Sequence, residues 1–140
     1  MVEYVVGFAF TADKQHVALI QKARPTWQRG KLNGIGGHVE DGESWAQAQA
    51  REFAEETGVD IHPSKWVAFA TLNGAGYLVR CFYAFDDAVR NILSITDEPV
   101  SLYRVADLPN LPAIPNLQYL IPLALDEEHI GVPLFSYGKR

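Results

Sequence analysis

Residues 37–59 read GHVEDGESWAQAQAREFAEETGV and carry carboxylates at a regular spacing. Glu52, Glu55 and Glu56 are three and four positions apart, so a helix would place all three on one face. Carboxylates that share a face repel each other unless a cation lies between them. The spacing therefore predicts a divalent metal ion and chemistry on a phosphate-like group. The alternative is a solvated acidic helix face, but it leaves the preceding Gly36–Gly37 pair and Glu43 unexplained.

The carboxylates are expected to lie on a well-delimited helix. Ser44 can cap its first turn together with Gln47, and Gly58 can end it, which predicts a helix over residues 44–57. Residues 33–40 contain three glycines, too many for the centre of a strand, and we expect this backbone to approach a ligand or a helix closely.

The remaining pattern indicates an α+β fold in which a mixed β-sheet lies between helices. Strands are predicted at residues 2–11, 16–22, 66–72, 77–85 and 100–105, and a second helix at 117–125, with Pro122 in its first turn or kinking it. Residues 126–140 indicate no clear element. The absence of a linker predicts one domain over residues 1–140.

Composition limits the classes of function. The net charge of −5 makes a nucleic-acid polymer an unlikely partner. The N-terminus lacks a basic region and a cleavage site, and no apolar run is long enough to span a bilayer, so we expect a cytoplasmic protein. Cys81 lies in an apolar run and is interpreted as a buried strand residue, with a reactive thiol as the alternative.

The same residues resemble the Nudix box, Gly-x5-Glu-x7-Arg-Glu-U-x-Glu-Glu-x-Gly-U, where U is aliphatic. Its polar and glycine positions are all filled, and the one departure is Phe53 at an aliphatic position; the matching residues are Gly37, Glu43, Arg51, Glu52, Phe53, Glu55, Glu56, Gly58 and Val59. The chain is similar to Nudix (MutT-like) hydrolases, and its order of strands and helices also resembles their α/β/α sandwich.

This resemblance implies a Mg²⁺-dependent enzyme, with Mn²⁺ as the other candidate, that cleaves a nucleoside diphosphate linked to another group. It assigns the metal to Glu52, Glu55, Glu56 and the carbonyl of Gly36, all hard oxygen donors. Glu52 is also a candidate general base, which in this family can lie outside the box. Arg51 would hold Glu52, and Glu43 would pair with Arg51 or line the metal site.

Glu98 is a candidate extra ligand or base, and a surface turn residue is the alternative. Candidate substrate residues lie outside the box and comprise Lys22, Arg24, Trp27, Asn33 and Asn116. Lys22 and Arg24 could bind phosphates, and the alternative is that they are ordinary surface charges. Asn33 can pair with a purine edge or sit in a turn.

Two of the substrate candidates concern recognition of the nucleobase. Trp27 can stack on a base or cover the core. Asn116 falls where enzymes that act on purine triphosphates are expected to carry an acidic residue, and the local sequence IPNL contains none.

The function predicted is a pyrophosphohydrolase for a small-molecule nucleoside diphosphate derivative, such as a (d)NTP or an oxidised purine nucleotide. ADP-ribose or a nucleotide sugar remains an alternative substrate, and a non-catalytic nucleotide-binding module an alternative function. We expect a monomer or a homodimer.

Overall fold

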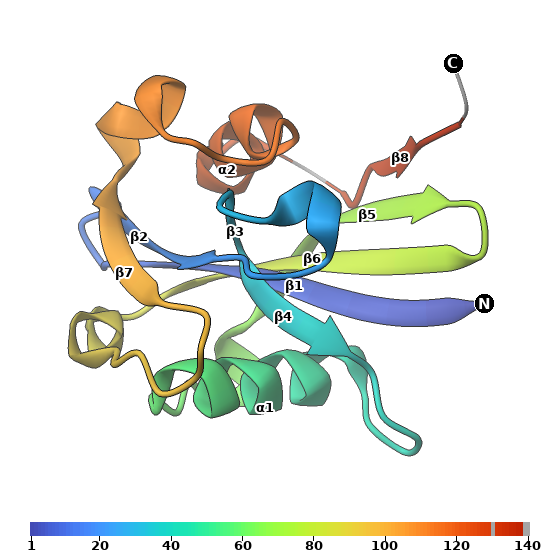
Figure 1. Ribbon diagram of the computed structural model, residues 1–140, viewed down its shortest axis with the longest axis horizontal. Coiled ribbons are helices and arrows are strands. Elements are labelled where there is room, and N and C mark those ends of the chain that lie inside the picture. The colour runs from blue at the N-terminus through green and yellow to red at the C-terminus, as the bar shows by residue number, and fades with distance from the viewer. Residues whose placement is uncertain (130, 139–140) are drawn as a thin grey trace.

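A mixed β-sheet lies between two α-helices in the computed structural model, which describes residues 1–129 and 131–138 (Figure 1). Helix α1 covers one face of the sheet and α2 the other, so the predicted α/β/α sandwich is confirmed. The elements are β1 (Val2–Phe10), β2 (His16–Gln21), η1 (Thr26–Gln28), β3 (Leu32–Asn33), β4 (Ile35–His38), α1 (Trp45–Thr57), η2 (Pro63–Lys65), β5 (Val67–Gly74), β6 (Tyr77–Phe85), η3 (Asp87–Asn91), β7 (Val100–Arg104), η4 (Val105–Asn110), α2 (Leu117–Leu125) and β8 (Leu134–Ser136).

Strand β1 is the centre of the sheet, whose main order is β3-β2-β1-β6-β5-β8. On one side, β1 pairs in parallel with β6 along its whole length, from Val2–Tyr77 to Phe10–Phe85. On the other side, residues 4–7 in the middle of β1 pair with β4 and the last two residues pair with β2, both antiparallel. Strand β7 pairs with β2, and β5 and β6 form the predicted hairpin.

The prediction that residues 33–40 are too rich in glycine to form a strand is wrong, because Ile35–His38 form β4. The close approach expected of these glycines is nevertheless present. A Cβ atom on Gly36 would lie 1.9 Å from the carbonyl oxygen of Val5 in β1. Glycine is therefore what allows β4 to pack against the centre of the sheet.

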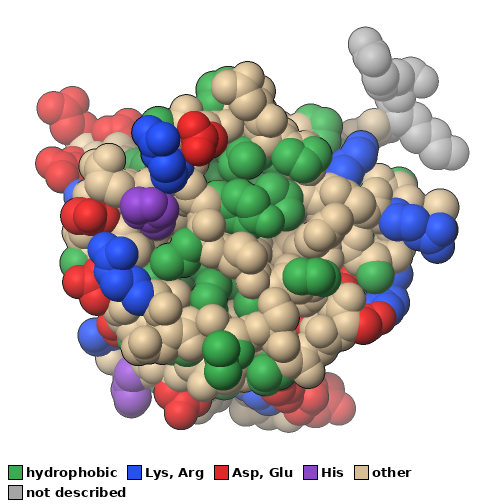
Figure 2. Space-filling view, turned by 60° about the vertical axis from the view of Figure 1, so that its left-hand side comes forward, with side chains coloured by type: hydrophobic (Ala, Val, Ile, Leu, Met, Phe, Trp, Pro, Cys, Tyr) green, Lys and Arg blue, Asp and Glu red, His purple; other side chains and the backbone are tan. Residues whose placement is uncertain are grey.

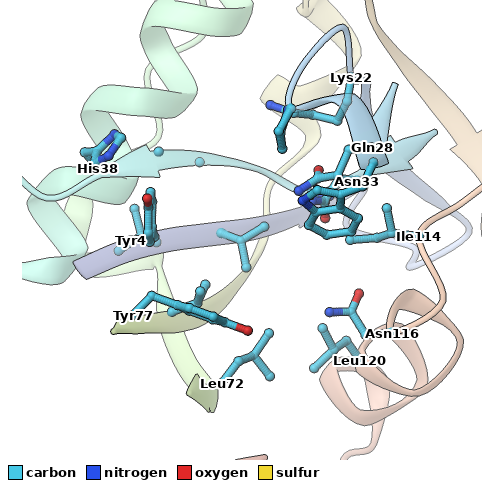
Figure 3. A pocket seen from close by; sticks show the side chains of 18 of the residues that line it. Tyr4, Lys22, Gln28, Asn33, His38, Leu72, Tyr77, Ile114, Asn116 and Leu120 are labelled. Carbon is cyan, nitrogen blue, oxygen red and sulfur yellow. The ribbon is translucent and has the colours of Figure 1, made fainter. Parts of the chain in front are cut away.

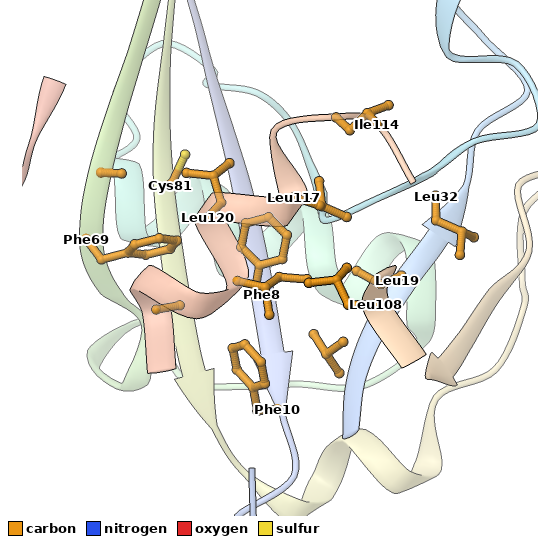
Figure 4. Close-up of a cluster of buried hydrophobic side chains, with 14 of the residues drawn as sticks. Phe8, Phe10, Leu19, Leu32, Phe69, Cys81, Leu108, Ile114, Leu117 and Leu120 are labelled. Carbon is orange, nitrogen blue, oxygen red and sulfur yellow. The ribbon is translucent and has the colours of Figure 1, made fainter. Parts of the chain in front are cut away.

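The core has one apolar cluster on each face of the sheet, and β1 contributes to both because its side chains alternate. Phe8 and Phe10 point toward α2, where they meet Leu117 and Leu120 (Figure 4). Ala9 belongs to the cluster beneath α1. The two helices are thus fixed to opposite faces of the same strand.

Both predicted ends of α1 are confirmed. The Ser44 hydroxyl accepts a hydrogen bond from the Gln47 backbone, and the Ser44 N–H donates to the Gln47 side chain, which completes a capping box. Gly58 ends the helix with a φ of 74°, the left-handed region that favours glycine. In α2, Pro122 lies in the second turn rather than in the first.

The segment after α2 adds β8, which pairs in parallel with β5 at the edge of the sheet. On the face shown in Figure 2, charged side chains lie mostly toward the rim, and acidic and neutral groups separate the basic ones. In the part of the chain that is described, none of the helices has both the length and the apolar content needed to cross a bilayer. Cys81 is fully buried in β6, as predicted.

Candidate active site

Arg51 on α1 connects the carboxylates of the box. Its Nε donates to Glu43 Oε2 at 2.7 Å and its Nη2 donates to Glu43 Oε1 at 2.9 Å, a two-point contact. This contact keeps the pKa of the Glu43 carboxyl below its ordinary value. Of the two arrangements expected for Glu43, the structure therefore has the pair with Arg51.

The same guanidinium also contacts the metal-ligand candidates. Arg51 Nη1 donates to Glu52 Oε1 at 3.0 Å and to Glu55 Oε2 at 3.2 Å. Its Nη2 donates to the carbonyl oxygen of His38 at 3.0 Å, which ties α1 to the end of β4. Arg51 thus neutralises part of the carboxylate charge and fixes the helix against the glycine strand.

Glu52 is half-buried against the backbone of Gly37. A Cβ atom on Gly37 would lie 2.5 Å from the Glu52 carboxyl carbon, so only glycine leaves room for this side chain. Burial raises the pKa of Glu52, and the neighbouring Glu55 and Glu56 add to the effect, while Arg51 opposes it. A buried carboxylate with acidic neighbours is a group that a cation would stabilise.

Glu56 faces the loop that precedes β7. Thr96 Oγ1 donates to Glu56 Oε2 at 2.9 Å and accepts the backbone N–H of Glu98 at 3.1 Å. With Arg51 and Thr96 bound to the glutamates, no three His, Cys, Asp or Glu side chains in residues 1–129 and 131–138 are gathered closely enough to ligate one ion. The donor set itself fits a hard divalent cation, because it consists of carboxylate oxygens beside a glycine backbone.

Glu98 is buried, with 5% of its surface exposed, so the alternative of a surface turn residue is wrong. Its Oε2 accepts the backbone N–H of Ala23 at 2.7 Å, and its Oε1 lies 3.4 Å from Lys22 Nζ. Arg24 Nη1 is 3.8 Å away. In this structure Glu98 therefore holds the loop after β2, and its role as a metal ligand stays a prediction.

A cavity of about 910 Å³ opens beside β4 (Figure 3). All five predicted substrate residues line it, namely Lys22, Arg24, Trp27, Asn33 and Asn116. Gly36 and Gly37 also line it, and Glu52 packs against Gly37. The two groups of predicted site residues, box carboxylates and substrate candidates, thus meet at this glycine pair.

Three amide side chains form one end of the cavity, and we call Gln28, Asn33 and Asn116 the amide end (Figure 3). Asn33 Nδ2 donates to Gln28 Oε1 at 3.1 Å, and Asn33 Oδ1 accepts the N–H of Gly34 at 2.7 Å. Asn116 stands at the start of α2 but does not cap it, and its Oδ1 is buried without a partner among the described residues. The amide end therefore contains one buried acceptor that no described residue uses.

Trp27 lies at the mouth of the cavity on η1. Because 63% of its surface is exposed, the alternative that it covers the core is wrong. Of the basic residues around it, Lys22 and Arg24 line the cavity, whereas Arg29 and Lys31 are exposed elsewhere.

Sequence reasoning missed part of the lining: Tyr4, Gln28, Tyr77 and Tyr137. A strand pattern does not show which face of a two-sided sheet borders a cavity, so the tyrosines carried no signal. Gln28, close to Asn33 in the chain, could have been included as a neighbouring amide. His38 at the end of β4 is exposed and also lines the cavity.

Phe53, the departure from the box pattern, is fully buried and meets the Trp66 ring edge-on at a centroid distance of 5.3 Å. The aromatic side chain thus fills the core beneath α1 and leaves the carboxylate face unchanged.

The site therefore consists of a glycine strand with a cavity on one side and a carboxylate helix on the other. In a comparison with known protein families, the NUDIX domain profile matches residues 1–123. The chain belongs to the NUDIX family. Nudix hydrolases generally use divalent metals and bind substrates derived from nucleotides.

Among similar proteins, the NAD-capped RNA hydrolase NudC of Stutzerimonas stutzeri (strain A1501) is 36% identical over 111 residues, which are 76% of this chain and 40% of that protein. The chain thus spans two fifths of the length of this curated relative. The MutT protein of Bacillus halodurans has a similar fold, with a TM-score of 0.75 at 19% identity over 99% of this chain and 91% of that one.

A further structural neighbour is NrtR of Shewanella oneidensis, solved in complex with a 27mer DNA. It has a TM-score of 0.69 at 25% identity and covers 86% of this chain and 59% of that one. A related fold is therefore present in a protein that binds DNA.

Proposed function

We propose that this chain is a metal-dependent pyrophosphohydrolase that cleaves a nucleoside diphosphate linked to another group. The observation that carries the proposal is the position of Gly37, which lines the cavity while the Glu52 carboxylate packs against it. A phosphate group held beside this glycine strand would lie next to the carboxylate helix. Residues 1–140 would act as one domain.

Mg²⁺, or Mn²⁺, would be held by Glu52, Glu55, Glu56 and the carbonyl of Gly36. Once bound, such an ion neutralises charge on phosphate oxygens and lowers the pKa of an attacking water. Within the protein, Arg51 orients Glu52 and Glu55 through its hydrogen bonds. Glu52 is the proposed base, because its raised pKa makes it a better proton acceptor than an exposed carboxylate.

Glu98 remains the second candidate for an extra ligand or base. To reach an ion, its carboxylate would have to release the N–H of Ala23 and the amine of Lys22. Lys22 would then be free to contact phosphate, whereas Arg24 would remain bound to Asp97.

The base of the nucleotide would occupy the amide end, between Trp27 and the Asn116 side chain. Rotation of the Asn116 side chain would turn its unpaired Oδ1 toward the cavity, where it could accept from an amino or imino group of a base. Asn33, which donates to Gln28, lies at the same end of the cavity. These groups suit a (d)NTP or an oxidised purine nucleotide, and they suit the adenine of ADP-ribose equally well. A nucleotide sugar would use the same contacts.

The test is a substrate panel with Mg²⁺ and Mn²⁺, comprising dNTPs, oxidised dGTP, ADP-ribose, dinucleoside diphosphates and nucleotide sugars. Glu52→Gln and Glu56→Gln should each lower kcat at least about 100-fold for whichever substrate is cleaved. Glu127→Gln, an exposed change beside Lys14, is the matched control and should keep wild-type activity. Full activity in either box variant would overturn the assigned roles.

A nucleotide-binding module without turnover is the other candidate function, in the manner of a Nudix-like fold attached to a regulator. The complete box argues against it, as does the bidentate Arg51–Glu43 contact that keeps the box ordered. Calorimetric binding of a nucleotide in the presence of metal, without product, would favour the module.

A further inference from the structure

The glycine pair Gly36–Gly37 of β4 is bound to α1 at both of its ends, where the helix runs beside the strand (Figure 1). Before the pair, Gln49 Nε2 donates to the carbonyl oxygen of Ile35 at 2.8 Å. After the pair, Arg51 Nη2 donates to the carbonyl oxygen of His38 at 3.0 Å. The pair thus lies between two hydrogen bonds, and both come from the helix that carries the box carboxylates.

Gln49 is a polar side chain in an apolar part of the core. It is fully buried, as is Phe53, which lies four residues further along on the same face of the helix. Its Oε1 atom has no hydrogen-bond partner among the described residues. Burying an amide that is only partly hydrogen-bonded is unfavourable, and an apolar side chain would fill this position with less loss of stability. Packing therefore does not explain the amide, whose contribution is the bond to Ile35.

The Gln49 amide is confined against the central strand of the sheet. A Cβ atom on Gly7 of β1 would lie 2.0 Å from Gln49 Nε2 and 2.8 Å from Trp66 Cζ3, so the amide and the indole ring both lie against bare glycine backbone. A side chain that is packed in this way cannot move to another rotamer without disturbing the core. The position of the Ile35 carbonyl therefore follows the position of α1.

The bond to Ile35 restricts the peptide that joins this residue to Gly36. Because a peptide is planar, a hydrogen bond to its oxygen also orients the N–H and the Cα atom of Gly36. Glycine has no side chain to limit its own dihedral angles, so the direction of the Gly36 carbonyl depends on its neighbours. This carbonyl is the proposed backbone ligand, and Mg²⁺ requires oxygen ligands at about 2.0–2.1 Å in a nearly octahedral arrangement.

We propose that Gln49 is a positioning residue for the metal site, at a place that the box pattern leaves open. It lies three residues before Glu52, about 4.5 Å along the helix axis at about 1.5 Å per residue. Its bond to Ile35 therefore keeps the Gly36 carbonyl at a fixed separation from the carboxylates, although Gln49 itself contacts neither metal nor substrate. This inference rests on the proposed function and adds to it a residue that acts through β4.

The test is the affinity for Mn²⁺ in the absence of substrate, measured from the signal of the free ion in electron paramagnetic resonance. Gln49→Met fills a similar volume but has no donor. It should raise the Kd for Mn²⁺ about 10-fold, the lower end of the range for a residue that orients a metal ligand. Gln49→Asn keeps the amide on a shorter side chain that should not reach Ile35, so we expect a loss of similar size.

Thr57→Val is the matched control, because Thr57 is the other buried polar residue on α1. Its Oγ1 donates to the carbonyl oxygen of Phe53 and accepts the N–H of Val59, and neither partner belongs to β4. The change removes buried hydrogen bonds from the same helix, so it should lower Tm but keep the Kd for Mn²⁺ within about twofold of wild type. Unchanged Mn²⁺ affinity in both Gln49 variants, or an equal loss in Thr57→Val, would overturn the inference.

Metal binding and turnover together distinguish this inference from the proposed function. If the Gln49 variants weaken Mn²⁺ binding but the wild type cleaves no substrate of the panel, the proposed function fails and the role of Gln49 stands. If the wild type is a metal-dependent hydrolase, and Glu52→Gln weakens Mn²⁺ binding whereas the Gln49 variants do not, the role of Gln49 fails and the proposed function stands.

Discussion

Gly37→Ala should inactivate the enzyme while leaving it folded. The new methyl carbon would lie 2.5 Å from the Glu52 carboxyl carbon, and ordinary contact begins at 3.4 Å. The carboxylate must therefore retreat by about 0.9 Å. Misplacing a catalytic group by about 1 Å costs on the order of 100-fold in rate, and we expect a loss of that size in kcat/KM.

The cost to stability should be small because the displaced atoms end a flexible side chain. Glu52 would lose its 3.0 Å hydrogen bond to Arg51, worth about 1–2 kcal/mol, or a fall in Tm of about 5 °C. Gly36→Ala is the contrasting change, because its Cβ would lie 1.9 Å from a backbone oxygen that cannot move aside. That variant should fail to fold.

The assay pairs initial rates on the best substrate of the panel, at saturating Mg²⁺, with thermal denaturation monitored by circular dichroism. Gly138→Ala is the matched control, since nothing lies within 4 Å of a Cβ atom there. It should behave as wild type in both measurements. If Gly37→Ala keeps kcat/KM within about threefold of wild type, the Glu52 carboxylate beside Gly37 is not in its working position and the reasoning is refuted.

Three further predictions concern groups outside the cavity. Burial raises the pKa of Cys81 to about 12, so at pH 8 a thiol reagent should leave the native protein unmodified and label one thiol after denaturation. Lys65 lowers the pKa of Asp86 below its ordinary 3.8; this stabilisation is complete above that value and is lost as the pH falls through the folded pKa, so the Tm advantage over Asp86→Asn should shrink below pH 3.8. Ser44→Ala should cost about 1 kcal/mol in urea denaturation and Ser44→Asn much less, since only the alanine cannot accept from Gln47.

The features that were predicted correctly depend on contacts close in the chain. The capping box of Ser44 and Gln47 and the stop at Gly58 join residues within four positions of each other, and the β5–β6 hairpin turns between Gly74 and Tyr77 and joins strands that are adjacent in the chain. These features are specified by residues close together in the chain, so they can be predicted from one sequence.

The features that were missed depend on contacts across the fold. β4 forms in spite of its glycines because only glycine lets its backbone lie so close to the backbone of β1. β8 forms because it pairs with the edge strand β5. Glu98 was a candidate ligand or base from its place before a predicted strand, but its burial beside Ala23 depends on a contact 75 positions away in the chain. The lining of the cavity combines Tyr4 with Tyr77, which come together only after β1 and β6 have paired.

The parallel pairing of β1 with β6 has a consequence for folding during synthesis. Among the described strands, the one at the centre of the sheet is synthesised first, but its longest partner ends at Phe85. Until then, the Phe8 and Phe10 rings have no complete core to enter. Such non-local pairing slows folding and leaves apolar segments exposed meanwhile. The nascent chain should therefore expose these rings until β6 and then α2, which supplies Leu117 and Leu120, have been synthesised.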